Sequence, residues 1–371
     1  MNRPLIAAAL VAGVAAVPLA VAAVAAQAPK TSMPKAANAD PNARSDKDMK
    51  RVTDKLAALG AKPLEQLTVA QARSQPTPAD AVKAVLKDMG RAITPPPGVT
   101  TRDIQYQAAA GMQPARLYMP AGAKGPLPVV LYFHGGGWVV ADIDTYDAGA
   151  RALARESGAM VVSAEYRKGP EHRFPAAHQD AVAAYKWTLA NAARLGGDPM
   201  RVAVAGESAG GNLAANVAIA ARDQKLRLPV HMILVYPVAG SNMNTPSYVA
   251  NAMAKPLGKG GMQWFVKHAL PTMAAAKDPR IDLVGAANLR RLPPATIINA
   301  EVDPLRSEGE QLAAKLTAAG VPTKQMTYQG VTHEFFGMDA VVGDAKVAQA
   351  MAGRELKMAF AKKPMRSAAK R

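Results

Sequence analysis

The sequence predicts a mixed α/β fold in which a mostly parallel, eight-stranded sheet is covered by helices on both faces. Two observations lead to this prediction. From about residue 99 onwards, short apolar segments alternate with longer segments of helical periodicity, and strands that alternate with helices form parallel sheets covered on both faces. In addition, glycine and polar residues follow several of the apolar segments, as expected where a site lies at the carboxyl ends of the strands.

The predicted elements follow one another in a regular order. A hairpin comes first, because residues 103–107 and 115–119 alternate between apolar and polar side chains. Most of the following strands are apolar, which is typical of strands that are buried on both faces. The predicted strands cover residues 129–133, 159–163, 202–205, 231–236, 296–300 and 324–328. Helical stretches separate them, at about 145–157, 176–195, 209–223, 261–270, 306–319 and 342–361.

Residues 1–28 are predicted to be a signal peptide. Arg3 precedes an uncharged run dominated by Ala and Val, and the small residues around Ala26 offer a cleavage site. A retained membrane anchor is the alternative, since the run is long enough to span a bilayer, but Gly13 and Pro18 interrupt it. We therefore expect export to the periplasm or the medium of a bacterium, without stable membrane insertion after cleavage.

The rest of the chain divides by composition. Residues 29–45 are rich in Ala, Pro, Asn and Lys and are predicted to be a flexible linker. Residues 46–98 contain two amphipathic helical patterns, which cannot form a core of their own and should pack on the main domain, residues 99–362. Residues 363–371 are predicted to be a basic, solvated tail. The apolar stripe of the first helical pattern comprises Met49, Val52, Leu56 and Leu59.

The overall charge and the absence of cysteine exclude several classes of site. The chain has a formal net charge of +17 and no cysteine, so it has no disulfide, no thiolate metal site and no cysteine nucleophile. A nucleic-acid-binding protein would gather its basic and aromatic residues on one patch. Here Lys and Arg are scattered outside the C-terminal tail, and we expect no nucleic-acid partner.

A G-x-S-x-G motif centred on Ser208 lies between a predicted strand and a predicted helix. In this position the motif is typical of a nucleophile elbow, a turn so tight that only glycine is accommodated on either side of the serine. The Ser208 hydroxyl is then held at a helix N-terminus, where the helix dipole favours negative charge. The alternative is an ordinary glycine-rich turn in which the serine only caps the helix.

Three consecutive glycines follow the predicted strand 129–133, in the sequence from His134 to Trp138. Backbone N–H groups in such a loop can point inward without interference from side chains, as an oxyanion hole requires. We expect donors from Gly135, Gly136 and Ala209. The chain has neither a G-x-G-x-x-G nor a G-K-[ST] motif, which disfavours a phosphate-binding loop.

Two further polar residues follow predicted strands, Asp303 after 296–300 and His333 after 324–328. Together with Ser208 they have the chain order Ser–acid–His of a hydrolase triad. In such a triad the histidine removes the serine proton, and the acid fixes the imidazole tautomer. Glu301 is the alternative acid. The other histidines are interpreted as structural or exposed, with His134 bracing its own loop, and no metal or cofactor is assigned because no such motif is present.

Several motifs together resemble the hormone-sensitive-lipase-like family of α/β-hydrolases. The likeness extends from about residue 50 to 360 and implies an α/β-hydrolase fold, hydrolysis of carboxylic esters and an N-terminal helical cap over the acyl pocket. Two departures are a Glu at 207, where Asp is commoner in the family, and Lys168-Gly169 in place of Leu-Ala. The motifs are His134-Gly135-Gly136-Gly137-Trp138, Glu165-Tyr166-Arg167, Pro170-Glu171-His172, Phe174-Pro175-Ala176, Gly206 to Gly211, Asp303-Pro304-Leu305 and the loop around His333.

We therefore expect an esterase that takes a small-molecule ester with a short to medium acyl chain and forms an acyl-enzyme on Ser208. The helical segment should close the substrate pocket, with its apolar stripe against a wall that includes Trp138, Trp264 and Phe335. The alternatives are a catalytically silent protein of this fold that binds a small molecule, or a lipase, lactonase or amidase of the same fold. The sequence leaves the oligomeric state open.

Overall fold

The computed structural model describes Met1 and residues 40–362. The predicted signal peptide, most of the predicted linker and the predicted basic tail lie outside the described residues, which exclude 2–39 and 363–371. No helix within the described part of the chain is both long enough and apolar enough to cross a membrane.

The centre of the domain is one eight-stranded sheet with the strand order β1-β2-β4-β3-β5-β6-β7-β8. β2 pairs antiparallel with β1 and β4, and all the other pairs are parallel. The predicted α/β fold with a mostly parallel sheet is therefore confirmed. The strands are β1 Val99–Ala108, β2 Gly111–Pro120, β3 Leu127–Phe133, β4 Met160–Ala164, β5 Gly197–Glu207, β6 Met232–Val235, β7 Ala295–Val302 and β8 Thr323–Thr332.

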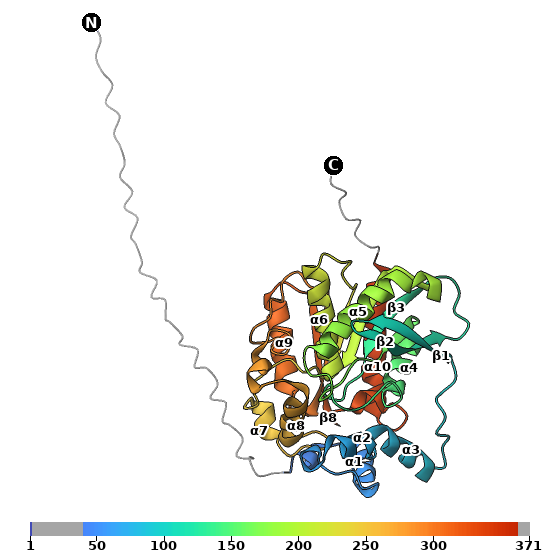
Figure 1. The fold of residues 1–371 in the computed structure, drawn as a ribbon, viewed down its shortest axis with the longest axis vertical. Coiled ribbons are helices and arrows are strands. Elements are labelled where there is room, and N and C mark those ends of the chain that lie inside the picture. The colour runs from blue at the N-terminus through green and yellow to red at the C-terminus, as the bar shows by residue number, and fades with distance from the viewer. Residues whose placement is uncertain (2–39, 363–371) are drawn as a thin grey trace. The chain divides into compact units, whose positions relative to one another are not determined.

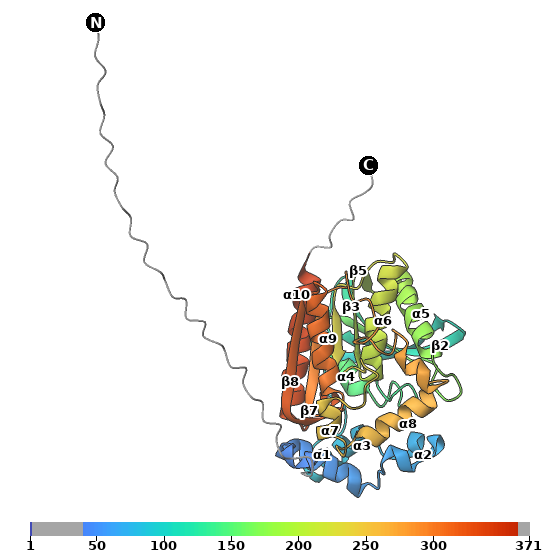
Figure 2. The ribbon, with the colours of Figure 1, turned by 90° about the vertical axis from the view of Figure 1, so that its left-hand side faces the viewer.

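Helices cover both faces of this sheet (Figures 1 and 2). Successive side chains of a strand point to opposite faces, so Leu131 packs in one core cluster with α5, α6 and α9, while Val130 and Tyr132 pack in the other with α4 and α10. Because both faces are covered, the central strands are mostly apolar. The helices are α4 Asp147–Ser157, α5 Ala176–Asn191, α6 Ala209–Asp223, α7 Pro246–Ala250, α8 Lys259–Ala269, α9 Arg306–Ala318 and α10 Gly343–Ala361.

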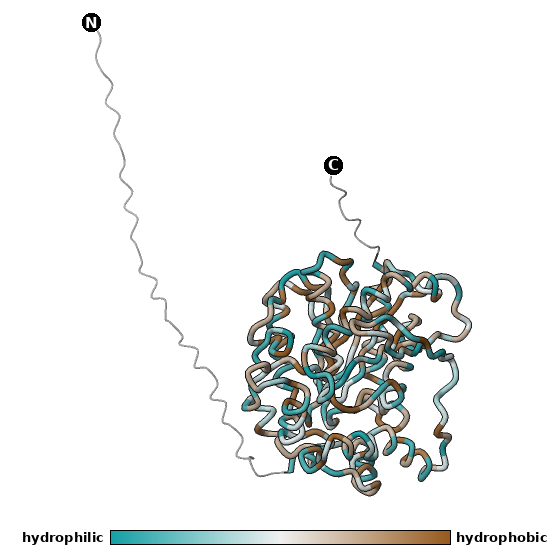
Figure 3. Tube along the Cα trace, in the orientation of Figure 1, coloured by the Kyte–Doolittle hydropathy of each residue, from teal (hydrophilic) through white to brown (hydrophobic). Residues whose placement is uncertain are grey.

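The N-terminal segment forms three helices, α1 Lys47–Ala58, α2 Val69–Ser74 and α3 Pro78–Asp88, rather than the two predicted ones. They lie together at one end of the sheet, beside α8, in both ribbon views (Figures 1 and 2), and Figure 3 shows hydrophobic and hydrophilic stretches side by side there. The unpredicted helix α2 begins with a capping box, in which Thr68 and Gln71 bond each other's backbone N–H groups.

The predicted linker 29–45 is wrong for its last residues. Pro41–Arg44 form a short 3₁₀ helix, η1, in which Pro41 is buried. Asn42 bonds to the main domain, because its amide donates to Met253 O at 3.2 Å and accepts from Lys255 N at 2.9 Å. The start signal is local: the Asp40 side chain accepts from Asn42 N at 3.0 Å, and a proline occupies the first position of the helix.

Candidate active site

Ser208 lies in a sharp turn between β5, which ends at Glu207, and α6, which begins at Ala209. Its backbone has φ 56° and ψ −117°, a strained conformation that non-glycine residues adopt mainly at functional sites. Both neighbouring glycines are required, because a Cβ on Gly206 would lie 2.1 Å from Gly210 O and one on Gly210 would lie 2.1 Å from Phe133 O. The motif thus forms the turn that was predicted from its sequence.

His333 and Asp303 form a buried pair beyond the ends of β8 and β7. The distance from His333 Nδ1 to Asp303 Oδ2 is 2.7 Å, and the second carboxylate oxygen accepts from Leu305 N at 2.8 Å. Burial lowers the pKa of His333, but the charge and hydrogen bond of Asp303 outweigh it, so that the pKa is raised overall. The alternative acid, Glu301, accepts instead from Gly330 N at 2.9 Å.

Ser208 and His333 line the same cavity. Within residues 40–362 there is no hydrogen bond from the Ser208 hydroxyl to the His333 ring. Hydrogen bonds between catalytic groups are often long in a ligand-free protein and tighten when substrate binds. The cavity wall therefore contains the predicted nucleophile, Ser208, and the predicted base, His333. The predicted acid, Asp303, lies outside the wall and bonds to Nδ1 of His333.

The glycine loop after β3 turns beside the elbow. Gly136 has φ 88°, and its carbonyl accepts from Val139 N and Val140 N at 3.0 Å. The backbone N–H groups of Gly135, Gly136 and Ala209 make no hydrogen bond among residues 40–362. Of these three residues only Gly136 lines the cavity together with Ser208. A Cβ on Gly136 would lie 2.2 Å from Val140 O, so this conformation requires glycine.

His134 braces this loop, as interpreted from the sequence. Its Nδ1 contacts Gly135 O at 2.8 Å, and its Nε2 contacts Glu165 Oε1 at 2.9 Å. The Tyr166 hydroxyl donates to the carbonyl groups of His134 and Gly135 at 2.9 and 3.0 Å, and its ring stacks on His134. These contacts fix the positions of the His134 and Gly135 carbonyl groups at the start of the loop.

The cavity that contains Ser208 and His333 has a volume of about 460 Å³. Two separate stretches of sequence enclose it above the strand ends: the N-terminal helices with their loops, and the loop 252–258 before α8. Arg73 ties the N-terminal helices to the glycine loop, because its side chain donates to Val139 O at 2.9 Å and to Gly169 O at 2.7 Å. The N-terminal helices contribute Thr53, Leu56, Ala57, Ala61, Lys62, Pro63, Leu64, Glu65, Ala72, Arg73, Gln75, Pro76, Thr77 and Pro78.

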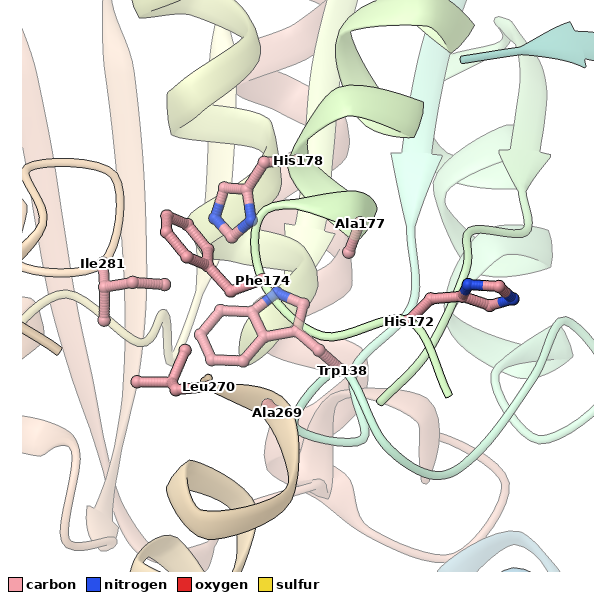
Figure 4. A pocket seen from close by; sticks show the side chains of 8 residues that line it. All are labelled: Trp138, His172, Phe174, Ala177, His178, Ala269, Leu270 and Ile281. Carbon is pink, nitrogen blue, oxygen red and sulfur yellow. The ribbon is translucent and has the colours of Figure 1, made fainter. Parts of the chain in front are cut away.

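The three aromatic residues predicted to line this pocket do not line it. Trp138 points into a separate small space beside Phe174 and His178 (Figure 4). Trp264 donates from Nε1 to the carbonyl oxygen of Leu67, which lies in the N-terminal segment just before α2, at 2.9 Å. Phe335 is fully buried in the core.

In each case the adjacent residue lines the cavity instead, namely Gly137, Phe265 and Glu334. Neighbours in a helix or turn point in different directions, so an error of one residue moves a side chain from the pocket to the core. The apolar stripe of α1 is likewise divided: Met49 and Val52 pack in the core cluster of Phe335, Leu56 lines the cavity, and Leu59 is 41% exposed.

Two carboxyl groups near the elbow were given no role from the sequence: Glu207, which is buried, and Glu334, whose side chain is 20% exposed. Glu207 accepts from the hydroxyl groups of Tyr132, at 2.5 Å, and Tyr236, and burial raises its pKa to about 7. Glu334 accepts from Tyr146 at 2.7 Å, and burial raises its pKa as well. The sequence marked Glu207 only as a departure from the usual Asp of the family, and it marked Glu334 only by its position next to His333.

The fold and this site define an α/β-hydrolase. A family model described as the alpha/beta hydrolase fold matches residues 130–337. The chain is similar to "Carboxylesterase NlhH" of Mycobacterium tuberculosis, with 38% identity over 292 residues, which cover 76% of this chain and 91% of the relative.

Two solved structures are also similar. An esterase from Pyrobaculum calidifontis is 36% identical with a TM-score of 0.74 and covers 84% of this chain and 98% of its own. A thermostable esterase from Pseudomonas putida is 34% identical with a TM-score of 0.77 and covers 85% of this chain and 98% of its own. The chain belongs to the hormone-sensitive-lipase-like family of α/β-hydrolases, a family of esterases and lipases.

Proposed function

We propose that this hydrolase cleaves carboxylic esters through an acyl-enzyme on Ser208, with His333 as general base and acid and Asp303 as its partner. The observation that carries the proposal is the strained Ser208 turn in one cavity with His333, whose Nδ1 is 2.7 Å from Asp303. Relatives named as esterases, similar over most of their length, support the same reaction.

The reaction follows from the groups in the cavity. His333 removes the proton from Ser208 as Oγ attacks the ester carbonyl, and Asp303 stabilises the imidazolium that forms. The negative charge on the former carbonyl oxygen is stabilised by the free N–H groups of Gly135, Gly136 and Ala209. His333 then protonates the leaving alcohol, and water attacks the acyl-enzyme with His333 again acting as the base.

We propose short to medium acyl chains as the substrate class. The cavity of about 460 Å³ is enclosed by the N-terminal helices and the loop 252–258, and an enclosed cavity of this size limits the length of an acyl chain. A lipase, lactonase or amidase activity uses the same groups, and an ester panel of varied chain length and alcohol, extended to lactones and amides, ranks these substrates directly.

Turnover of p-nitrophenyl esters by point variants tests the mechanism. Ser208→Ala and His333→Ala should each lower kcat by roughly 10⁴ or more, while circular dichroism reports an intact fold. Asp303→Asn should lose activity because the imidazole adopts the wrong tautomer, and Glu301→Gln should lose less. Near-native turnover in Ser208→Ala would exclude the acyl-enzyme, and no turnover in the unaltered protein would favour a silent binding protein of this fold.

We further propose that the protein is exported and acts in the periplasm or outside the cell of a bacterium. The uncharged N-terminal run with small residues near Ala26 motivates this proposal. N-terminal sequencing of the protein recovered from the periplasm and medium should begin near residue 27. A full-length product that fractionates with membranes would identify a retained anchor instead.

A further inference from the structure

Arg44 lies just before α1 and bonds to two residues of the main domain. Its guanidinium donates from Nη1 to Glu301 Oε1 at 3.3 Å and from Nη2 to Asn251 Oδ1. Asn251 is fully buried, and its amide donates to Glu301 O at 3.2 Å and to Asp303 O at 2.9 Å. One arginine of the N-terminal segment is thus connected to the backbone that carries Asp303.

The same segment is also connected to the end of β8, just before His333. Glu301 accepts from Gly330 N at 2.9 Å through its second carboxylate oxygen, and Asp46 N donates to Gly330 O at 2.8 Å. Gly330 lies in β8, three residues before His333, and Glu301 lies in β7, two residues before Asp303. Glu301 therefore links the ends of β7 and β8, and the N-terminal segment bonds to both of them.

We propose that Arg44, Asn251 and Glu301 form a positioning network that holds Asp303 and His333 at the distance needed for catalysis. The inference rests on the proposed function, because it assigns the network to the predicted triad. None of these three residues lines the cavity, so they act through the ends of β7 and β8 and do not touch substrate. The residues directly before α1 are then part of the active-site framework.

A network of this kind affects turnover more than binding. Catalytic groups displaced by a fraction of an ångström lose rate without losing the substrate pocket. Since the charge and hydrogen bond of Asp303 raise the pKa of His333, a looser pair also lowers that pKa. The two consequences, lower kcat and a shifted pH profile, separate positioning from a general loss of stability.

Arg44→Ala in the full chain tests the network, with Arg91→Ala as the matched control. Arg91 also bonds the N-terminal segment to the main domain, through Nη1 to Ala340 O at 2.8 Å, but among the described residues it makes no hydrogen bond to Asn251 or Glu301. Arg44→Ala should lower kcat for a p-nitrophenyl ester roughly tenfold with KM little changed, and should move the acidic limb of the pH profile to lower pH. Arg44→Lys should restore part of the activity, and Arg91→Ala should keep wild-type kcat.

A spectroscopic measurement makes the network testable without turnover. The His333 Nδ1 proton in its hydrogen bond to Asp303 should give a downfield NMR signal that is broadened or shifted in Arg44→Ala and retained in Arg91→Ala. Unchanged kcat, pH profile and NMR signal in Arg44→Ala would overturn the network, as would equal losses in both variants. Ser208→Ala tests the proposed function separately from the network. If Ser208→Ala kept its turnover, the proposed acyl-enzyme mechanism would be wrong, and the NMR signal of His333 would still test the network.

Discussion

Glu308 should make the stability of this protein fall as pH rises. The residue lies near the start of α9, is 1% exposed and accepts from Ala239 N and Gly240 N at 2.8 Å through Oε2. Its other oxygen makes no hydrogen bond of ordinary length among the described residues, but the Tyr248 hydroxyl lies close enough to oppose part of the rise in the pKa of Glu308. Burial raises the pKa of Glu308 to about 8, so the native protein holds this proton at neutral pH.

The direction of the change in stability with pH follows from the difference in proton binding between the folded and unfolded chains. The unfolded chain releases the Glu308 proton near pH 4.5, whereas the folded chain keeps it to about pH 8. The stabilising contribution is therefore complete below pH 4.5, declines between 4.5 and 8, and is lost above 8. At about 1.4 kcal/mol per pKa unit the whole change is roughly 5 kcal/mol, an upper limit because entry of water reduces the cost of burying the charge.

Urea unfolding of the wild type and Glu308→Gln at pH 5 and pH 9 measures this contribution. The amide keeps a side-chain acceptor for the two backbone N–H groups and cannot ionise, so the wild type should lose stability relative to Glu308→Gln by several kcal/mol between the two pH values. Glu310→Gln, on the same helix but 46% exposed, is the matched control and should follow the wild type. Parallel stability curves for wild type and Glu308→Gln would refute the reasoning.

Three further outcomes concern the site. Arg73→Ala removes the bonds from the cap to Val139 and Gly169 and should lower kcat/KM roughly tenfold by loosening the cavity wall, measured by steady-state kinetics beside limited proteolysis of the cap. Gly136→Ala should lower kcat at least about 100-fold, because its Cβ would collide with the Val140 carbonyl and displace an oxyanion donor; a thermal melt checks the fold. The pH profile of kcat/KM should rise with an apparent pKa above the usual 6.5 of histidine, since His333 acts as a neutral base, and Asp303→Asn should move any residual profile to lower pH.

The parts of the fold that were predicted correctly depend on local rules. Helix α6 was predicted at its observed bounds because the G-x-S-x-G turn fixes where it begins. The buried central strands were found because burial on both faces requires apolar segments, and the two hairpin strands were found from their alternating side chains. Helix α2 was missed although Thr68 and Gln71 mark its start, because the helix has only six residues and too few turns for a clear apolar period.

The candidate site was predicted unevenly for a similar reason. Ser208, Asp303 and His333 follow strands of one parallel sheet, so their meeting at the strand ends follows from topology alone. The direction of a neighbouring side chain does not follow from topology: Trp264 bonds to the cap while Phe265 faces the cavity. Which of Glu301 and Asp303 bonds to His333 also had to come from the structure, because both residues lie at the end of the same strand.

The cap is connected to the catalytic domain by polar bonds as well as by apolar packing. Arg73 and Trp264 bond across the boundary in opposite directions, one from the cap to the glycine loop and the other from α8 to Leu67 of the cap. Each bond uses a backbone carbonyl as acceptor, which fixes the height of the cap above the strand ends whatever side chains line the cavity. In the proposed mechanism the N–H groups of Gly136 and Ala209 act on a developing charge, and their effect increases when water is excluded. Under that mechanism the cap position set by these bonds should influence the rate of the chemical step as well as the size of the substrate.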